Sequence, residues 1–166
     1  MKIRKALCLV MAVATVCCMA LASCGDENTA ESKAEKTATN VSMDVVETAD
    51  KLKDDIEYKD TLNELPESKI EKLFGLATTD YVKGKVYVGS GGATAEEIAC
   101  FEAKDSDGAA NIKAALENRI ESQKKAFENY QPQEMDKLND PVLVVKDKYV
   151  LMCVSDDNAK AQEIIG

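Results

Sequence analysis

The spacing of apolar residues along the chain predicts several amphipathic helices. Over residues 42–58 apolar side chains recur every three or four positions with Lys, Asp and Glu between them, as on one face of a helix. A shorter helix is expected to begin at Pro66, which suits a first helical turn, and to stop at Gly75. Helical spacing returns over residues 107–130, and Pro132 prevents its continuation.

Short runs rich in β-branched residues predict a sheet. Apolar and polar side chains alternate over residues 82–89, as in a half-buried strand, and a glycine-rich turn at residues 90–93 returns the chain. Only Asp147 and Lys148 separate two later runs, which is the length of a tight hairpin turn. These features predict two hairpins, with strands at residues 82–89, 97–103, 142–146 and 149–154.

Together the elements predict an α+β fold in a single domain over residues 42–166. The expected order is ααββαββα, with a last helix over residues 156–165. Strands of this length favour a four-stranded antiparallel sheet with helices packed against it.

The first 23 residues have the architecture of an export signal. Lys2, Arg4 and Lys5 precede an uncharged apolar run over residues 6–22. This run is shorter than the roughly 18 residues of a spanning helix, and acidic residues follow it. We therefore expect residues 1–23 to be a signal peptide that is removed.

The end of this signal resembles the lipobox of bacterial lipoproteins, formed here by Leu21, Ala22, Ser23 and Cys24. The small residues allow an extended backbone to enter a peptidase, and the thiolate of Cys24 supplies the nucleophile for a thioether bond. Two or three acyl chains make anchoring stable, at about 0.8 kcal/mol per buried CH₂. The resemblance implies lipid attachment at Cys24, on the extracytoplasmic face of the cell membrane; the alternative is an ordinary secretory signal with a chance cysteine.

A polar segment separates this cysteine from the predicted domain. Residues 25–40 contain no branched aliphatic or aromatic side chain, which is typical of a disordered tether. We place the tether at residues 24–41, where flexible-chain scaling gives a span of roughly 20–25 Å.

The charge of the chain argues against nucleic acid as a partner. The formal net charge is −9, and loss of residues 1–23 would leave 18 of the 21 basic residues against 30 acidic ones, or −12. Nucleic acid binding depends on Lys and Arg neutralising phosphates, and anionic lipid surfaces repel so acidic a domain. We therefore expect membrane attachment through the lipid on Cys24 alone.

Two of the six cysteines, Cys100 and Cys153, lie within the predicted domain. Both occur in apolar runs, where a free thiol packs as a small hydrophobic residue. The alternative is a disulfide between them, which requires their Cβ atoms to lie within about 4 Å. Since the chain has no histidine, we expect no metal site and no Ser–His–Asp or Cys–His catalytic centre. We also expect no cofactor.

Two short motifs have both a binding and a structural interpretation. Residues 88–94 are rich in glycine and could hold a phosphate, but they lack the Lys-Ser/Thr pair of a P-loop, so a hairpin turn with positive φ is favoured. Residues 105–108 resemble the start of a calcium loop, but Ala109 and Leu116 occupy later ligand positions. A helix cap is favoured there.

Other polar and aromatic residues have structural interpretations as well. Asp156 and Asp157 are interpreted as a helix cap rather than an acid/base couple. Thr94 and Glu97 match a capping box, which would place a helical turn before the second strand. Tyr130 is expected to anchor the core at the end of the long helix, with ligand stacking as the alternative.

Three blocks of the domain resemble one family. The resemblance spans most of residues 45–165, and the blocks agree with the family in order and spacing. It is to the bacterial lipoproteins of domain of unknown function 4358, which implies a lipoprotein and carries over no catalytic residue. The blocks are residues 95–105 (AEEIACFEAKD), residues 119–132 (RIESQ through NYQP) and residues 148–150 (KYV).

We expect a noncatalytic, lipid-anchored module that binds an envelope protein or peptide through a sheet face or through edges that carry tyrosines. One alternative is a hydrolase-like enzyme that uses a carboxylate pair, which requires a cleft where two acids converge and one has a raised pKa. The other is a purely structural envelope protein, which would have no concave apolar pocket.

Overall fold

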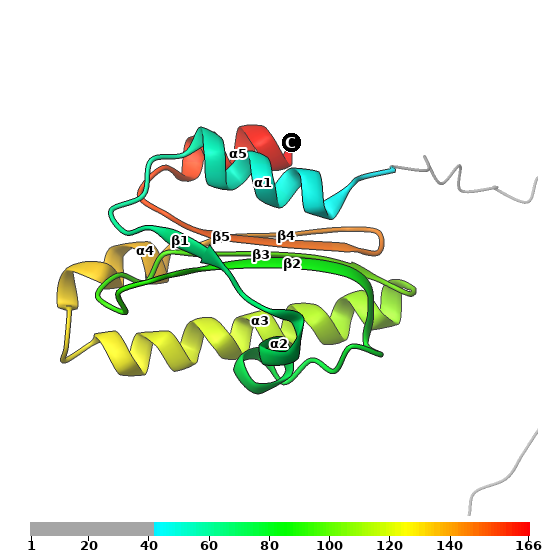
Figure 1. Cartoon of the computed structure of the whole chain (residues 1–166), viewed down its shortest axis with the longest axis horizontal. Coiled ribbons are helices and arrows are strands. Elements are labelled where there is room, and N and C mark those ends of the chain that lie inside the picture. Colours follow the sequence, from blue (N-terminus) through cyan, green and yellow to red (C-terminus); the bar gives the residue numbers. More distant parts are fainter. Residues whose placement is uncertain (1–41) are drawn as a thin grey trace, which may run out of the picture. The chain divides into compact units, whose positions relative to one another are not determined.

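The computed structural model describes residues 42–166, whose helices and strands form three layers (Figure 1). The strands are β1 (Leu62–Glu64), β2 (Tyr81–Gly89), β3 (Glu97–Ala103), β4 (Val142–Lys146) and β5 (Tyr149–Val154). The helices are α1 (Val45–Asp55), α2 (Glu67–Phe74), α3 (Ser106–Phe127), α4 (Met135–Asn139) and α5 (Asn158–Ile165), with a 3-10 turn η1 (Pro132–Glu134) before α4.

All strands of this region pair antiparallel in one sheet, in the order β1-β2-β3-β5-β4. The α+β class is therefore confirmed, and the four predicted strands are present. The prediction of a four-stranded sheet is wrong, because a fifth strand, β1, pairs with the outer edge of β2. This strand has only three residues, of which only Leu62 is buried, so it shows no alternation long enough to detect.

Helices cover both faces of the sheet: α1 and α5 lie on one side, and α2 and α3 on the other (Figure 1). Side chains of the central strands alternate between two apolar clusters, as the period of two requires. Phe101 and Met152 belong to the cluster under α3, whereas Ile98 and Leu151 belong to the cluster under α1 and α5. The predicted binding through a sheet face is wrong for β5, because every residue of that strand is buried.

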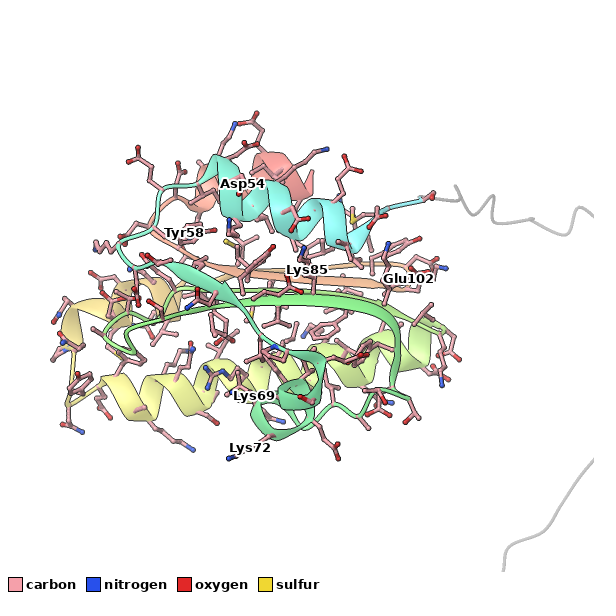
Figure 2. The ribbon with its side chains drawn as sticks, viewed as in Figure 1. Asp54, Tyr58, Lys69, Lys72, Lys85 and Glu102 are labelled. Carbon is pink, nitrogen blue, oxygen red and sulfur yellow. The ribbon has the colours of Figure 1, made fainter. Side chains whose placement is uncertain are left out.

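A polar contact holds α1 against the sheet. Lys85 of β2 lies beneath this helix (Figure 2), and its Nζ is 2.7 Å from Asp50 Oδ1. The same carboxylate accepts a hydrogen bond of 2.6 Å from Tyr87 Oη. These hydrogen bonds lower the pKa of Asp50, so its charge is retained under the helix.

Both predicted helix caps are confirmed. The side chain of Asp105 accepts a hydrogen bond from the Gly108 amide at the start of α3, and that of Asp157 accepts one from the Lys160 amide at the start of α5. The prediction that Tyr130 anchors the core is wrong. Phe127 completes the buried stripe of α3, whereas Tyr130 follows the helix end and is 64% exposed.

The segment after Pro132 differs from the prediction in another way. α3 ends at Phe127, before Pro132. The fixed φ of this proline suits the first position of a new turn, and η1 and α4 follow directly. Within residues 42–166, none of the helices combines the length and the apolar character required to cross a bilayer. The predicted signal (residues 1–23), the lipid-bearing Cys24 and the tether (residues 24–41) lie outside the described residues.

Candidate functional site

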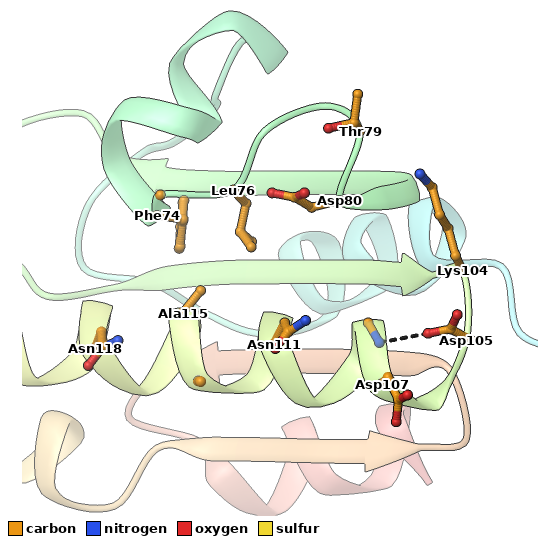
Figure 3. Close-up of a pocket in the computed structure, with 13 residues that line it drawn as sticks. Phe74, Leu76, Thr79, Asp80, Lys104, Asp105, Asp107, Asn111, Ala115 and Asn118 are labelled. Atoms are coloured by element: carbon orange, nitrogen blue, oxygen red, sulfur yellow. Dashed lines mark hydrogen bonds between the residues drawn. The ribbon is translucent and has the colours of Figure 1, made fainter.

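A groove of about 720 Å³ lies between the loop after α2 and the first half of α3 (Figure 3). Its apolar part is formed by Phe74, Leu76 and Ala115. Polar side chains surround this part: Thr79, Asp80, Lys104, Asp107, Asn111 and Asn118. The groove therefore combines a small apolar surface with several hydrogen-bonding groups, as ligand sites generally do.

Local backbone geometry builds the wall on the side of α2. The helix ends at Gly75, whose φ of 72° is the left-handed conformation that glycine adopts without strain. The chain then turns Leu76 inward, where it is buried. Asp80 closes the following loop by accepting a hydrogen bond of 2.8 Å from the Ala77 amide. This loop is thus held in one conformation beside the groove.

The opposite wall is the N-terminal half of α3. Asp105 caps the helix through the Gly108 amide at 2.8 Å (Figure 3). A Cβ atom on Gly108 would lie 3.3 Å from the Asp105 carboxylate and 3.4 Å from Ala103 Cβ. Glycine at this position therefore allows the first turn of α3 to approach the end of β3 closely.

Successive turns of α3 present Asn111, Ala115 and Asn118 to the groove (Figure 3). The alanine leaves the helix surface accessible between two amide side chains. Within residues 42–166, the side chains of Lys104, Asp107, Asn111 and Asn118 form neither hydrogen bonds nor ion pairs, although other residues of α3 do. Their donors and acceptors are thus available to a ligand.

The charge of the groove favours some ligands over others. Asp80, Asp105 and Asp107 line it against one cation, Lys104. Asp80 and Asp105 each use one carboxylate oxygen for an internal hydrogen bond and keep the other. An excess of acceptors beside an apolar surface suits a ligand with cationic and apolar groups, and it disfavours phosphates and other anions.

Charged residues at the other end of β3 are buried and paired. The Nζ atom of Lys137 lies 2.9 Å from Glu96 Oε1 and 2.9 Å from Glu134 Oε2, and all three side chains are at most 3% exposed. Glu96 also accepts hydrogen bonds of 3.0 Å from the backbone amides of Lys59 and Asp60. These contacts offset the cost of removing the charges from water, and they join α4 to the loop after α1.

Glu97 occupies a second buried site on the side of α3. Arg119 Nη2 donates to its Oε2 at 2.7 Å, Arg119 Nε donates at 3.1 Å, and Gln123 Nε2 donates at 2.9 Å. Burial raises the pKa of the Glu97 carboxyl, and Arg119 opposes that rise. The predicted capping box with Thr94 is wrong, because Glu97 is the first residue of β3. The buried acids of this end are therefore bound to cations or amides of the domain itself, and none of them lines the groove.

The glycine-rich hairpin loop surrounds a carboxylate of the protein itself. Asp60 accepts hydrogen bonds from Ser90 Oγ at 2.9 Å and from the Gly91 amide at 2.6 Å. These donors lower the pKa of Asp60. Gly92 has a φ of 67°, as a turn with positive φ requires, so the hairpin interpretation is confirmed. The carboxylate of Asp60 thus occupies the place that a bound phosphate would take in this loop.

Cys100 and Cys153 are buried free thiols in the cluster beneath α1 and α5. Cys100 lies opposite Leu151, and Cys153 lies opposite Ile98, so the two cysteines are diagonal neighbours. Diagonal Cα atoms are roughly 7–8 Å apart, beyond the roughly 4.4–6.8 Å that a disulfide spans. Burial raises the pKa of both thiols, and the structure favours their packing role over the disulfide.

The groove itself was not identified from the sequence. Its polar residues are spread over residues 79–118 and resemble a solvated helix face when taken separately. One signal was available: Asn111 and Asn118 are seven residues apart, which is two helical turns, and two alanines, Ala114 and Ala115, lie between them. The motif at residues 105–108 does lie here, as a cap. No group of three or more His, Cys, Asp or Glu side chains within residues 42–166 is arranged to hold a metal ion.

Comparison with known proteins gives one match. The sequence profile described as "Domain of unknown function (DUF4358)" matches residues 54–155. That range includes all the residues that line the groove and both buried charge sites. No curated protein and no solved structure matches the chain.

Proposed function

This chain belongs to the DUF4358 family, and on that premise we propose that it is a lipid-anchored binding protein of the bacterial cell envelope whose ligand occupies the groove beside α3. The observation that carries the proposal is the set of unpaired polar side chains around an apolar surface on rigid elements. The side chains of Lys104, Asp107, Asn111 and Asn118 line the groove and form no hydrogen bond or ion pair with the rest of the described domain.

The proposed ligand is an extended peptide segment of another envelope protein, with basic and apolar side chains. Asp80, Asp105 and Asp107 would contact the basic groups, while Phe74 and Leu76 would contact an apolar side chain. Asparagine amides both donate and accept hydrogen bonds, so Asn111 and Asn118 suit the alternating C=O and N–H groups of a peptide backbone. In this proposal the groove binds the peptide without changing it, so the role is noncatalytic.

The proposed location depends on the N-terminal segment. The sequence from Leu21 to Cys24 supports diacylation of the Cys24 thiol and cleavage before it. The acyl chains would hold the protein at the extracytoplasmic face of the membrane, and residues 24–41 would let the domain turn toward partners. A purely structural envelope protein would have no need of the groove.

Photo-crosslinking in intact cells tests the binding role. A photoreactive amino acid replaces Ala114, which lines the groove, or Ala126, an exposed alanine of the same helix outside it. The two positions are twelve residues apart, or about 18 Å along the helix. We expect position 114 to give a crosslinked envelope protein or peptide that position 126 does not give. Equal patterns at both positions, or none at position 114, would contradict the proposal.

Mass spectrometry of the mature N-terminus tests the anchor separately. We expect the first residue to be Cys24 with a diacylglycerol thioether, and Cys24→Ser to remove the lipid and release the chain from the membrane fraction. An unmodified full-length chain would disprove the anchor and leave the groove proposal to be judged by the crosslinks.

A further inference from the structure

Strand β4 forms one open edge of the sheet. Among the strands of residues 42–166 it pairs with β5 alone, and the hairpin turn at Asp147 and Lys148 closes on the pair Lys146–Tyr149. A β-turn of this kind joins the residues that flank it by hydrogen bonds, and bonded pairs alternate along an antiparallel ladder. The backbone groups of Val144 therefore face β5, whereas those of Leu143 and Val145 face outward.

Pro141 precedes β4 and Lys146 ends it, so the usual protection of an edge strand lies only at its two ends and not at its three central residues. Within residues 42–166, neither backbone nor side-chain groups outside the sheet bond the N–H or C=O of Leu143 and Val145. Natural edge strands normally carry charges, proline or bulges that prevent further pairing. The middle of β4 is Leu143, Val144 and Val145, and Val145 is 41% exposed. The opposite edge, β1, differs because it has three residues and ends in Glu64.

We propose that β4 pairs antiparallel with β4 of a second copy of this chain, which joins two five-stranded sheets into one of ten strands. The two-fold axis passes beside Val144, which faces its own counterpart. Leu143 and the partner's Val145 then exchange two N–H···O=C hydrogen bonds, and symmetry provides two more. This inference is independent of the lipid anchor and of the groove.

A second copy fits this edge because the strand is complementary to itself. With Val144 at the axis, each of the three central positions meets an apolar residue of the partner, and such cross-strand pairs stabilise sheets. The charges agree as well. With Val144 at the axis, Asp140 comes opposite Lys148 of the partner, so antiparallel pairing brings opposite charges toward each other. Parallel pairing would bring like charges together, and a strand of another protein would not require this symmetry.

Cysteine crosslinking of the full chain, purified in a mild detergent, tests the pairing. Val144→Cys places two thiols opposite each other in a non-hydrogen-bonded pair, where Cβ atoms are closest. We expect mild oxidation to give a reducible dimer. In Val145→Cys each thiol faces Leu143 of the partner instead, so dimer should not exceed the level of the unsubstituted chain. Mixing Leu143→Cys with Val145→Cys should restore the crosslink.

Two further variants connect the crosslink with edge pairing. Val145→Pro removes an outward N–H and leaves the ladder to β5 intact, so in the Val144→Cys chain it should abolish the dimer. Val145→Thr keeps the N–H and should retain the dimer. Circular dichroism must show that each variant is folded. The proposal would be overturned if Val144→Cys and Val145→Cys crosslinked equally, or if neither Val144→Cys nor the mixture gave a crosslink. A crosslink to a different protein would also overturn it.

Discussion

The two ends of β3 use charged and polar side chains in opposite ways. At its start, Glu96 and Glu97 are almost fully buried, and each is bound by a cation from a distant helix. Beyond its end, Lys104 and Asp107 are exposed and form no contact of this kind among the described residues. Buried charges require partners, so the charged groups of the first end are occupied by contacts within the domain, whereas those of the second end are available to a ligand.

The largest expected effect breaks the buried end. Lys137→Met removes the cation shared by Glu96 and Glu134 and leaves two buried carboxylates without it. We expect the free energy of unfolding, measured in urea, to fall by about 3–5 kcal/mol. The matched control is Lys51→Met, whose ammonium pairs with Glu47 on the surface and should cost less than about 1 kcal/mol. Similar losses in both variants would contradict the distinction.

A smaller effect is expected where the groove meets the end of β3. Asp105→Ala removes the cap of α3, and we expect a loss of about 1 kcal/mol in unfolding free energy. Asp105→Asn retains an acceptor oxygen and should lose only part of that amount. Denaturation curves of the two variants check this order, and an alanine variant as stable as the original chain would show that the cap is dispensable.

The third prediction concerns pH and the loop before β3. Because the folded pKa of Asp60 lies below its ordinary value of 3.8, its contribution to stability is present above that value. It is lost as the pH falls through the folded pKa. Asp60→Asn should therefore lose less unfolding free energy than the original chain between about pH 5 and pH 2. Ser90→Ala removes one donor to the carboxylate and should give an intermediate acid dependence; an unchanged slope in both variants would refute this explanation.

The smallest expected effect on stability comes from the groove. Replacing both Asn111 and Asn118 with alanine removes no hydrogen bond or ion pair seen within residues 42–166, and alanine favours helices, so unfolding free energy should stay within about 0.5 kcal/mol or rise slightly. Crosslinking from position 114 should nevertheless fall sharply. Glu121→Ala, on the same helix outside the groove, should leave the crosslink unchanged. A large loss of stability in the double variant would indicate a structural role instead.

Local patterns predicted most of the fold. Strands β3, β4 and β5 begin and end at the predicted residues, because each is a short apolar run bounded by polar or turn residues. The same reasoning assigned Tyr130 to the core and failed, since a helical stripe does not show where the helix stops. Phe127 already fills the last buried position.

Features that depend on distant residues were not predictable in this way. Glu96 and Glu97 resemble surface acids in the sequence, and their cations are 41 and 22 residues away. The groove likewise forms only when the loop after α2 meets α3. Without the tertiary fold, nothing separates Lys137, which is buried, from any other lysine on a polar helix.

The unequal edges of the sheet limit the size of any assembly. A sheet that accepted strands at both edges would grow without end, as amyloid fibrils do. Here β1 is short and polar, while β4 is longer and apolar. If only the β4 edge can pair with another chain, no further chain can add once two copies have joined. The difference between the two edges would therefore limit assembly to a closed dimer.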